Sequence, residues 1–161
     1  MSKSKNTDAL SDQRPILVAV DFSDDSMAAL HWACEYSLDS GVPLVLLHVV
    51  HDPVSSPGFY QVDSGDNLQS MQEVAETKMA GFLEEAQRTG PDESALKGVG
   101  TRFVAGLPAG RIIEMADRMN ARLIVMGSKG LSGLPHVLLG SVAERVVQQA
   151  QQPVTVVKTA K

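Results

Sequence analysis

The sequence predicts an α/β fold, in which a parallel β-sheet of five strands carries helices on both of its faces. Short apolar runs and helix-patterned stretches alternate along the 161 residues, and this alternation is typical of a parallel sheet. The apolar runs are continuous, as expected of strands that are covered on both faces. With 43% hydrophobic residues, a chain of this length can form one sizeable core.

The first strand and the first helix are expected between residues 15 and 41. Residues 15–21 form an apolar run bounded by polar residues and predict a buried strand. Ser23 is placed to cap the following helix, and Asp24 and Asp25 stand in its first turn, where acidic side chains favour the helix dipole. Gly41 is expected to end this helix. The apolar residues that recur at helical spacing are Ala29, Trp32, Ala33 and Tyr36.

The second strand is predicted over residues 44–50, and within it His48 is expected to be a core histidine rather than a catalytic base. Residues 52–67 contain two prolines and two glycines and predict a long loop. A helix is expected to follow, up to about residue 89, and Gly90 with Pro91 closes it. Its apolar side consists of Met71, Ala75, Met79, Phe82 and Ala86.

A weaker strand is predicted over residues 99–104. Gly106 and Pro108 then mark a turn into a third helix, which Asn120 is expected to end. The apolar stripe of this helix is predicted at Ile112, Met115, Ala116 and Met119.

The last three elements are a strand over residues 122–126, a helix over about residues 142–150 and a strand over residues 153–157. If the strand order is 3-2-1-4-5, the first strand lies beside the fourth. Ligands of such sheets bind at the carboxyl ends of those two strands, where the winding reverses. The loops that begin at Asp21 and Gly127 would then lie together.

The loop after the fourth strand is dense in glycine. Gly127, Gly130, Gly133 and Gly140 punctuate a connection that is long for a strand and a helix. Glycines let the backbone approach a ligand closely and adopt positive φ. The helix that follows presents free N–H groups and a partial positive charge, which suit a phosphate. The pattern therefore predicts a phosphate-binding loop, although Gly-x4-Gly-Lys-Ser/Thr is absent.

Two residues of this loop have alternative interpretations. Ser141 and Glu144 fit a Ser-x-x-Glu capping box, so Ser141 is a candidate helix cap as well as a phosphate ligand. Lys129 stands between two glycines, where its ammonium group either meets a phosphate or is solvated at the surface.

The spacing Gly-x2-Gly-x9-Gly-Ser resembles the nucleotide-binding loop of the universal stress protein family, in the subset that binds ATP. The resemblance covers residues 15–158 and implies a Rossmann-like fold of the adenine nucleotide alpha hydrolase-like type, with strand order 3-2-1-4-5. The residues that match the nucleotide contacts of the family are Ala19, Val20, Asp21, Val49, Met126, Gly127, Lys129, Gly130, Gly140, Ser141 and Val142.

The resemblance implies a protein that binds ATP with Mg²⁺ and acts as a regulatory switch in the stress response. Val49 would contact the adenine, and Asp21 would accept a ribose hydroxyl or help hold the cation; the alternative for Asp21 is a helix cap. Slow ATP hydrolysis with autophosphorylation, binding of AMP or cyclic AMP, and a scaffold without ligand remain alternatives. Asp21 and Lys129 are not accompanied by a further convergent acid, base or arginine, so fast turnover is not expected.

The composition limits the kinds of binding partner and the cellular compartment that we expect. The net charge of −5 and the scattered Lys and Arg residues argue against sequence-independent binding of nucleic acid. The single cysteine, Cys34, is expected to be a small buried hydrophobe, and a chain without a disulfide suits the cytoplasm. Residues 1–13 lack the apolar stretch of a signal peptide and are expected to be a disordered tail ahead of one domain, residues 14–161. No run is long enough to span a membrane.

The last strand predicts a partner of its own kind. Val154–Val157 is rich in β-branched residues and is expected at an edge of the sheet, where unpaired N–H and C=O groups invite pairing with a second copy. Relatives in the family dimerise in this way, so the resemblance implies a homodimer.

Overall fold

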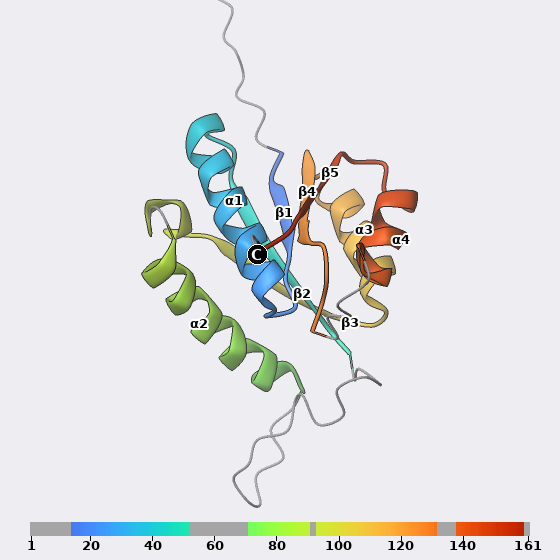
Figure 1. Cartoon of the computed structure of the whole chain (residues 1–161), viewed down its shortest axis with the longest axis horizontal. Coiled ribbons are helices and arrows are strands. Elements are labelled where there is room, and N and C mark those ends of the chain that lie inside the picture. The colour runs from blue at the N-terminus through green and yellow to red at the C-terminus, as the bar shows by residue number, and fades with distance from the viewer. Residues whose placement is uncertain (1–13, 52–70, 91–92, 132–137, 160–161) are drawn as a thin grey trace, which may run out of the picture.

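The computed structural model describes residues 14–51, 71–90, 93–131 and 138–159. Strands and helices alternate along the chain, as the sequence predicts (Figure 1). The elements are β1 (Ile16–Ala19), α1 (Asp24–Ser40), β2 (Leu44–Val50), α2 (Met71–Thr89), the short 3-10 helix η1 (Glu93–Leu96), β3 (Gly100–Ala105), α3 (Pro108–Arg118), β4 (Leu123–Gly127), α4 (Ser141–Gln149) and β5 (Val154–Val157). The sequence pattern did not predict η1.

The five strands form one parallel sheet in the order β3-β2-β1-β4-β5, as predicted. β1 lies at the centre, and Ala19 at its carboxyl end is level with Leu47 of β2 and Met126 of β4. The chain crosses from β3 to β4 past β2 and β1, so the winding reverses between β1 and β4. The loops that leave these two strands therefore lie side by side.

Helices cover both faces of the sheet, α1 and α2 on one side and α3 and α4 on the other (Figure 1). Alternate residues of β1 divide between the two cores: Ile16 and Val18 face α1 and α2, whereas Leu17 and Ala19 face α3 and α4. This division explains the continuous apolar runs, because a strand covered on both faces buries successive side chains.

The helix ends follow the sequence in α1 but not in α4. Ser23 accepts a hydrogen bond from Ser26 N as the N-cap of α1, and Gly41 ends that helix with a left-handed φ of 69°. In α4 the predicted capping box is wrong, because Gly140 is the N-cap and no side chain caps the helix. Ser141 is instead the first helical residue.

Most residues of the predicted apolar stripes are buried, and the exceptions lie at the margins. In α1, Trp32 and Tyr36 stack on each other at the margin of the core, with ring centroids 5.4 Å apart. Met71 of α2 and Val147 of α4 are exposed, by 39% and 47%. Helical spacing alone does not show which apolar residues lie at the edge of the buried face, because the width of that face depends on the neighbouring elements.

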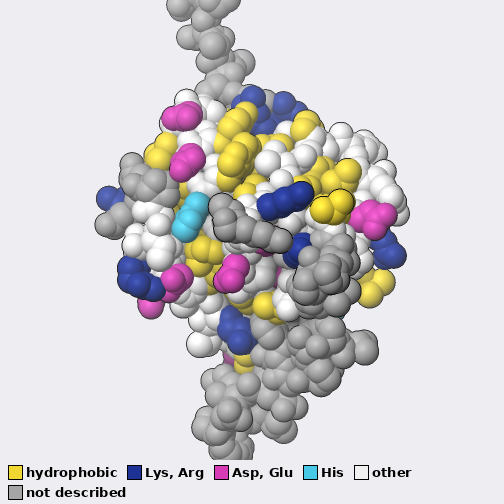
Figure 2. Space-filling view, viewed as in Figure 1, with side chains coloured by type: hydrophobic (Ala, Val, Ile, Leu, Met, Phe, Trp, Pro, Cys, Tyr) yellow, Lys and Arg dark blue, Asp and Glu magenta, His cyan; other side chains and the backbone are white. Residues whose placement is uncertain are grey.

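Two predicted segments, the tail over residues 1–13 and the loop over residues 52–67, lie outside the described residues. Among the described helices, none is both long and apolar enough to cross a membrane. On the face shown in Figure 2, basic and acidic side chains are interspersed with hydrophobic ones.

Candidate functional site

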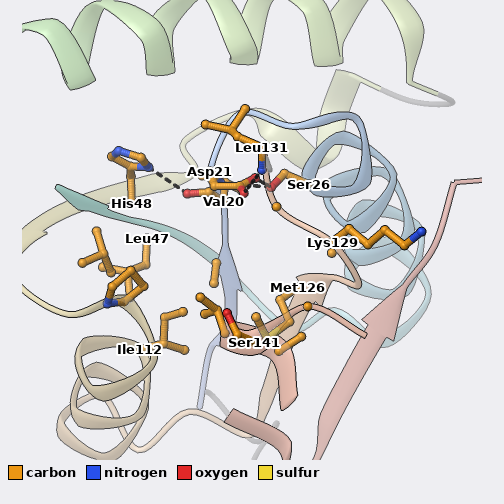
Figure 3. Close-up of a pocket in the computed structure, with 18 of the residues that line it drawn as sticks. Val20, Asp21, Ser26, Leu47, His48, Ile112, Met126, Lys129, Leu131 and Ser141 are labelled. Atoms are coloured by element: carbon orange, nitrogen blue, oxygen red, sulfur yellow. Dashed lines mark hydrogen bonds between the residues drawn. The ribbon is translucent and has the colours of Figure 1, made fainter. Parts of the chain in front are cut away.

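A cavity of about 260 Å³ opens at the carboxyl ends of β1 and β4, where the winding reverses (Figure 3). All eleven residues that the family resemblance singled out line it. Nine further described residues complete the wall: Ser26, Leu47, His48, His51, Pro108, Ile112, Ser128, Leu131 and Ala143.

One side of the cavity is apolar. Ala19, Leu47, Val49 and Met126 belong to the core that packs against α3 and α4, and they end three neighbouring strands. Ile112 of α3 closes the same side (Figure 3). An apolar wall of this kind suits a flat aromatic base.

Another part of the wall is formed by the first turn of α4. The N–H groups of Ser141, Val142 and Ala143 have no acceptor within their helix, since the first bond in that ladder runs from Glu144 N to Gly140 O. No side chain caps them, and all three residues line the cavity. In Figure 3 the Ser141 side chain points toward the cavity. This turn offers donors and a positive dipole end to an anion.

Close packing, not positive φ, explains the described glycines of the loop. None of Gly127, Gly130 and Gly140 has a left-handed φ. A Cβ at Gly127 would lie 2.7 Å from the carbonyl carbon of Asp25 and 2.9 Å from Ser26 N, and one at Gly140 would lie 3.1 Å from Ser128 O. The glycines thus let the loop lie directly on the N-terminus of α1. Gly133 lies outside the described residues.

Asp21 ties the loop after β1 to the glycine loop. Its Oδ1 accepts hydrogen bonds from Ser23 N (3.1 Å), Ser23 Oγ (2.5 Å) and Ser26 Oγ (2.5 Å). Its Oδ2 accepts one from Leu131 N at 3.2 Å. Asp21 is not the N-cap of α1, which is Ser23. Within the described part of the chain, Leu131 N is the one donor to Oδ2, so this oxygen retains capacity for a further partner.

A second carboxylate, that of Asp25, holds the start of the glycine loop. Asp25 Oδ2 accepts hydrogen bonds from Ser128 Oγ at 2.7 Å and Lys129 N at 3.0 Å. Burial acts to raise the pKa of Asp25, but the hydrogen bonds from Ser128, Thr159 and Lys129 N outweigh it and hold the pKa below its ordinary value. The carboxylate is therefore the form that these donors favour.

Lys129 is placed by its backbone. Its N–H is directed at Asp25, and in Figure 3 its side chain extends away from the cavity. In this conformation the ammonium group does not point at the position where a phosphate would meet α4.

His48 is a buried structural residue at the margin of the cavity. Its side chain is 3% exposed, its Nδ1 lies 2.8 Å from Val20 O, and its ring stacks on Phe22 with centroids 4.3 Å apart. Burial lowers the pKa of His48, which favours the neutral ring that donates from Nδ1. Cys34 is buried as predicted, and burial with the nearby charge of Glu35 raises its pKa to about 11.

Sequence reasoning missed the residues that shape the loop. Asp25 reads in the sequence as an ordinary first-turn acid, and Ser26 and Ser128 carry no motif. Two features hint at their role: the run Ser-Asp-Asp-Ser that follows Asp21, and the absence of a side chain at Gly127. Neither hint specifies a contact between residues more than 100 positions apart.

Comparisons with known proteins agree with the fold. A model of the "Universal stress protein family" matches residues 13–158. Universal stress protein MJ0531 of Methanocaldococcus jannaschii is 32% identical over 148 residues, which cover 92% of this chain and 84% of the relative.

Two solved structures share the fold. A universal stress protein in complex with cAMP is 24% identical with a TM-score of 0.63, covering 92% of this chain and 98% of its own. The universal stress protein of Archaeoglobus fulgidus in complex with dAMP is 23% identical with a TM-score of 0.59, covering 90% and 98%. By its sequence match over nearly its whole length, this chain belongs to the universal stress protein family.

Proposed function

We propose that the protein binds an adenine nucleotide in the cavity at the carboxyl ends of β1 and β4 and acts as a nucleotide-dependent regulatory switch in the stress response. One observation carries the proposal: an apolar wall around Val49 and Met126 and an uncapped helix N-terminus line the same cavity. The wall suits the base, and the amides of α4 suit the phosphates. Fold relatives in complex with cAMP and dAMP support an adenine ligand.

ATP with Mg²⁺ is the ligand that we expect. A phosphate chain can reach from the first turn of α4 towards Gly130 and Asp21, which line the same cavity. Magnesium retains several waters and binds through phosphates with one or two carboxylates. Asp21 fits this part, because it is the one carboxylate among the described lining residues and its Oδ2 accepts a single hydrogen bond.

A switch is favoured over a rapid enzyme by the chemistry of the wall. Phosphoryl transfer requires metal ligands, a base or water-positioning group, and a cationic clamp. Among the described lining residues, Lys129 is the one Lys or Arg, and its side chain extends away from the cavity (Figure 3). His48 is neutral and already bonded to Val20 O. Slow hydrolysis with autophosphorylation remains the second candidate.

The test is titration calorimetry of nucleotide-free protein with ATP, AMP and cyclic AMP in the presence of Mg²⁺. For Ser141→Ala we expect the affinity for ATP to fall about tenfold, as is typical on losing a hydrogen bond to a charged group. The melting temperature should not change, because Ser141 does not cap α4.

Ser40→Ala is the matched control, since the Ser40 hydroxyl bonds Tyr36 O at the far end of α1. Wild-type protein that gives no binding heat with any of the three nucleotides would contradict nucleotide binding. Many turnovers per minute with labelled ATP would favour the enzyme over the switch.

We also propose that the protein forms a homodimer through β5. β5 ends the sheet, and all four of its residues are partly exposed. Such an edge offers backbone groups that a second copy can satisfy with two-fold symmetry.

A further inference from the structure

One carboxylate joins three segments that are distant in the sequence. Asp25 lies in the first turn of α1, and its Oδ2 holds Ser128 and Lys129 at the start of the glycine loop. Its Oδ1 accepts hydrogen bonds from Thr159 N at 3.2 Å and from Thr159 Oγ1 at 2.8 Å. Thr159 follows β5, so the same side chain contacts both the loop and the C-terminal segment.

The start of the glycine loop, residues 127–129, is enclosed between the end of β5 and the first turn of α1. Ser128 is 1% exposed, and its N–H donates to Val157 O at the end of β5, 2.8 Å away. On its other side, Gly127 lies so close to the backbone of Asp25 that a Cβ would overlap it. Residues 127–129 therefore cannot shift without disturbing either the hydrogen bond to the end of β5 or the packing against the first turn of α1.

We propose that Asp25 is a positioning residue for the nucleotide, through which the seating of the C-terminal segment at Thr159 sets the affinity of the cavity. This inference rests on the proposed nucleotide binding. The hydrogen bond from Lys129 N fixes the peptide between Ser128 and Lys129, directly ahead of Gly130, and so fixes the direction in which the loop enters the cavity wall. Thr159 does not line the cavity, and its hydroxyl is linked to the glycine loop through the carboxylate of Asp25.

Coupling of this kind is reciprocal: nucleotide binding should in turn hold the C-terminal segment in place. The segment directly continues the edge strand β5. A partner that pulls on it would therefore weaken nucleotide binding, and a partner that seats it would strengthen binding.

The test measures the ATP affinity of full-length Asp25→Asn, Thr159→Val and the double variant by calorimetry with Mg²⁺. We expect Asp25→Asn to weaken binding about tenfold and Thr159→Val about threefold, and the double variant to bind no more weakly than Asp25→Asn alone, because contacting residues are non-additive. Thr159→Ser keeps the hydroxyl and should restore wild-type affinity. Asp24→Asn removes the same charge from the same helical turn at an exposed position and should bind as the wild type.

A second readout does not need nucleotide. In ligand-free protein, the amide of Lys129 should exchange with deuterium at least about tenfold faster in Asp25→Asn than in Asp24→Asn, because its acceptor is weakened. If wild-type protein binds no nucleotide, the proposed function fails, while this exchange still tests the role of Asp25. Wild-type ATP affinity in Thr159→Val, additive losses in the double variant, or unchanged exchange at Lys129 would each overturn the inference. Should Asp25→Asn fail to fold, Thr159→Val against Thr159→Ser carries the test.

Discussion

At the scale of residues, the glycines of the loop are required by contacts within the protein itself. Gly127 lies against the backbone of Asp25 and Ser26, neither of which can move without displacing the N-terminus of α1. A phosphate-binding loop and a tightly packed loop thus have the same glycine pattern in the sequence. The structure shows that close packing accounts for Gly127, because a Cβ at this position would point into α1.

We predict that Gly127→Ala lowers the free energy of unfolding by about 1–3 kcal/mol, the usual cost of inserting a methyl group into close packing. Urea denaturation measures this change. Gly81→Ala is the control: no atom lies within 4 Å of its added Cβ in the middle of α2, so it should raise the stability by about 0.5–1 kcal/mol. Equal stabilities for Gly127→Ala and the wild type would show that the loop does not pack against α1 in solution.

The residues that line the site could be predicted better than the hydrogen bonds between them. The family pattern named eleven residues, and the structure brings all of them to one cavity. The roles of Asp25 and Ser128 could not be predicted, because their hydrogen bond spans 103 positions and depends on the final packing of α1 against β4. The cap at Ser141 was predicted wrongly, since a Ser-x-x-Glu pattern does not show that the helix begins at Ser141 itself, one residue earlier than a cap at Ser141 requires.

At the scale of elements, β5 is the strand with a free edge beside the loop. Pro153 O and Val157 O accept hydrogen bonds from Ile124 N and Ser128 N of β4. Because residues of a strand alternate in direction, the N–H groups of Val154 and Val156 point away from β4.

We predict that Val156→Pro converts the dimer into a monomer, because proline removes an outward N–H without breaking the ladder to β4. Sedimentation equilibrium measures the mass. Val156→Thr keeps the N–H and the branched shape and should remain dimeric. A folded Val156→Pro protein of unchanged dimeric mass would exclude pairing along this edge.

Element identities were predictable and their margins were not. All five strands and four helices follow from the apolar runs, because a sheet covered on both faces leaves a strong pattern. The short helix η1 carries no such pattern. Of the predicted α1 stripe, Ala29 and Ala33 are buried, whereas Trp32 and Tyr36 lie at the margin of the core.

At the scale of the whole molecule, the strand order decides where the site lies. β1 and β4 are neighbours although α1, β2, α2, η1, β3 and α3 separate them in the chain. This arrangement brings Asp21 beside the glycine loop. The apolar ends of β1, β2 and β4 and the first turn of α4 then line the same cavity. The alternation of elements predicted the parallel sheet, and the resemblance to the family supplied the order of its strands.

The most direct measurement is a crystal structure of the protein grown with ATP and Mg²⁺. We expect phosphate oxygens within hydrogen-bonding distance of the Ser141 and Val142 amides, and the base against Val49 and Met126. A nucleotide bound elsewhere on the molecule, or this cavity empty at saturating ATP, would contradict the central claim.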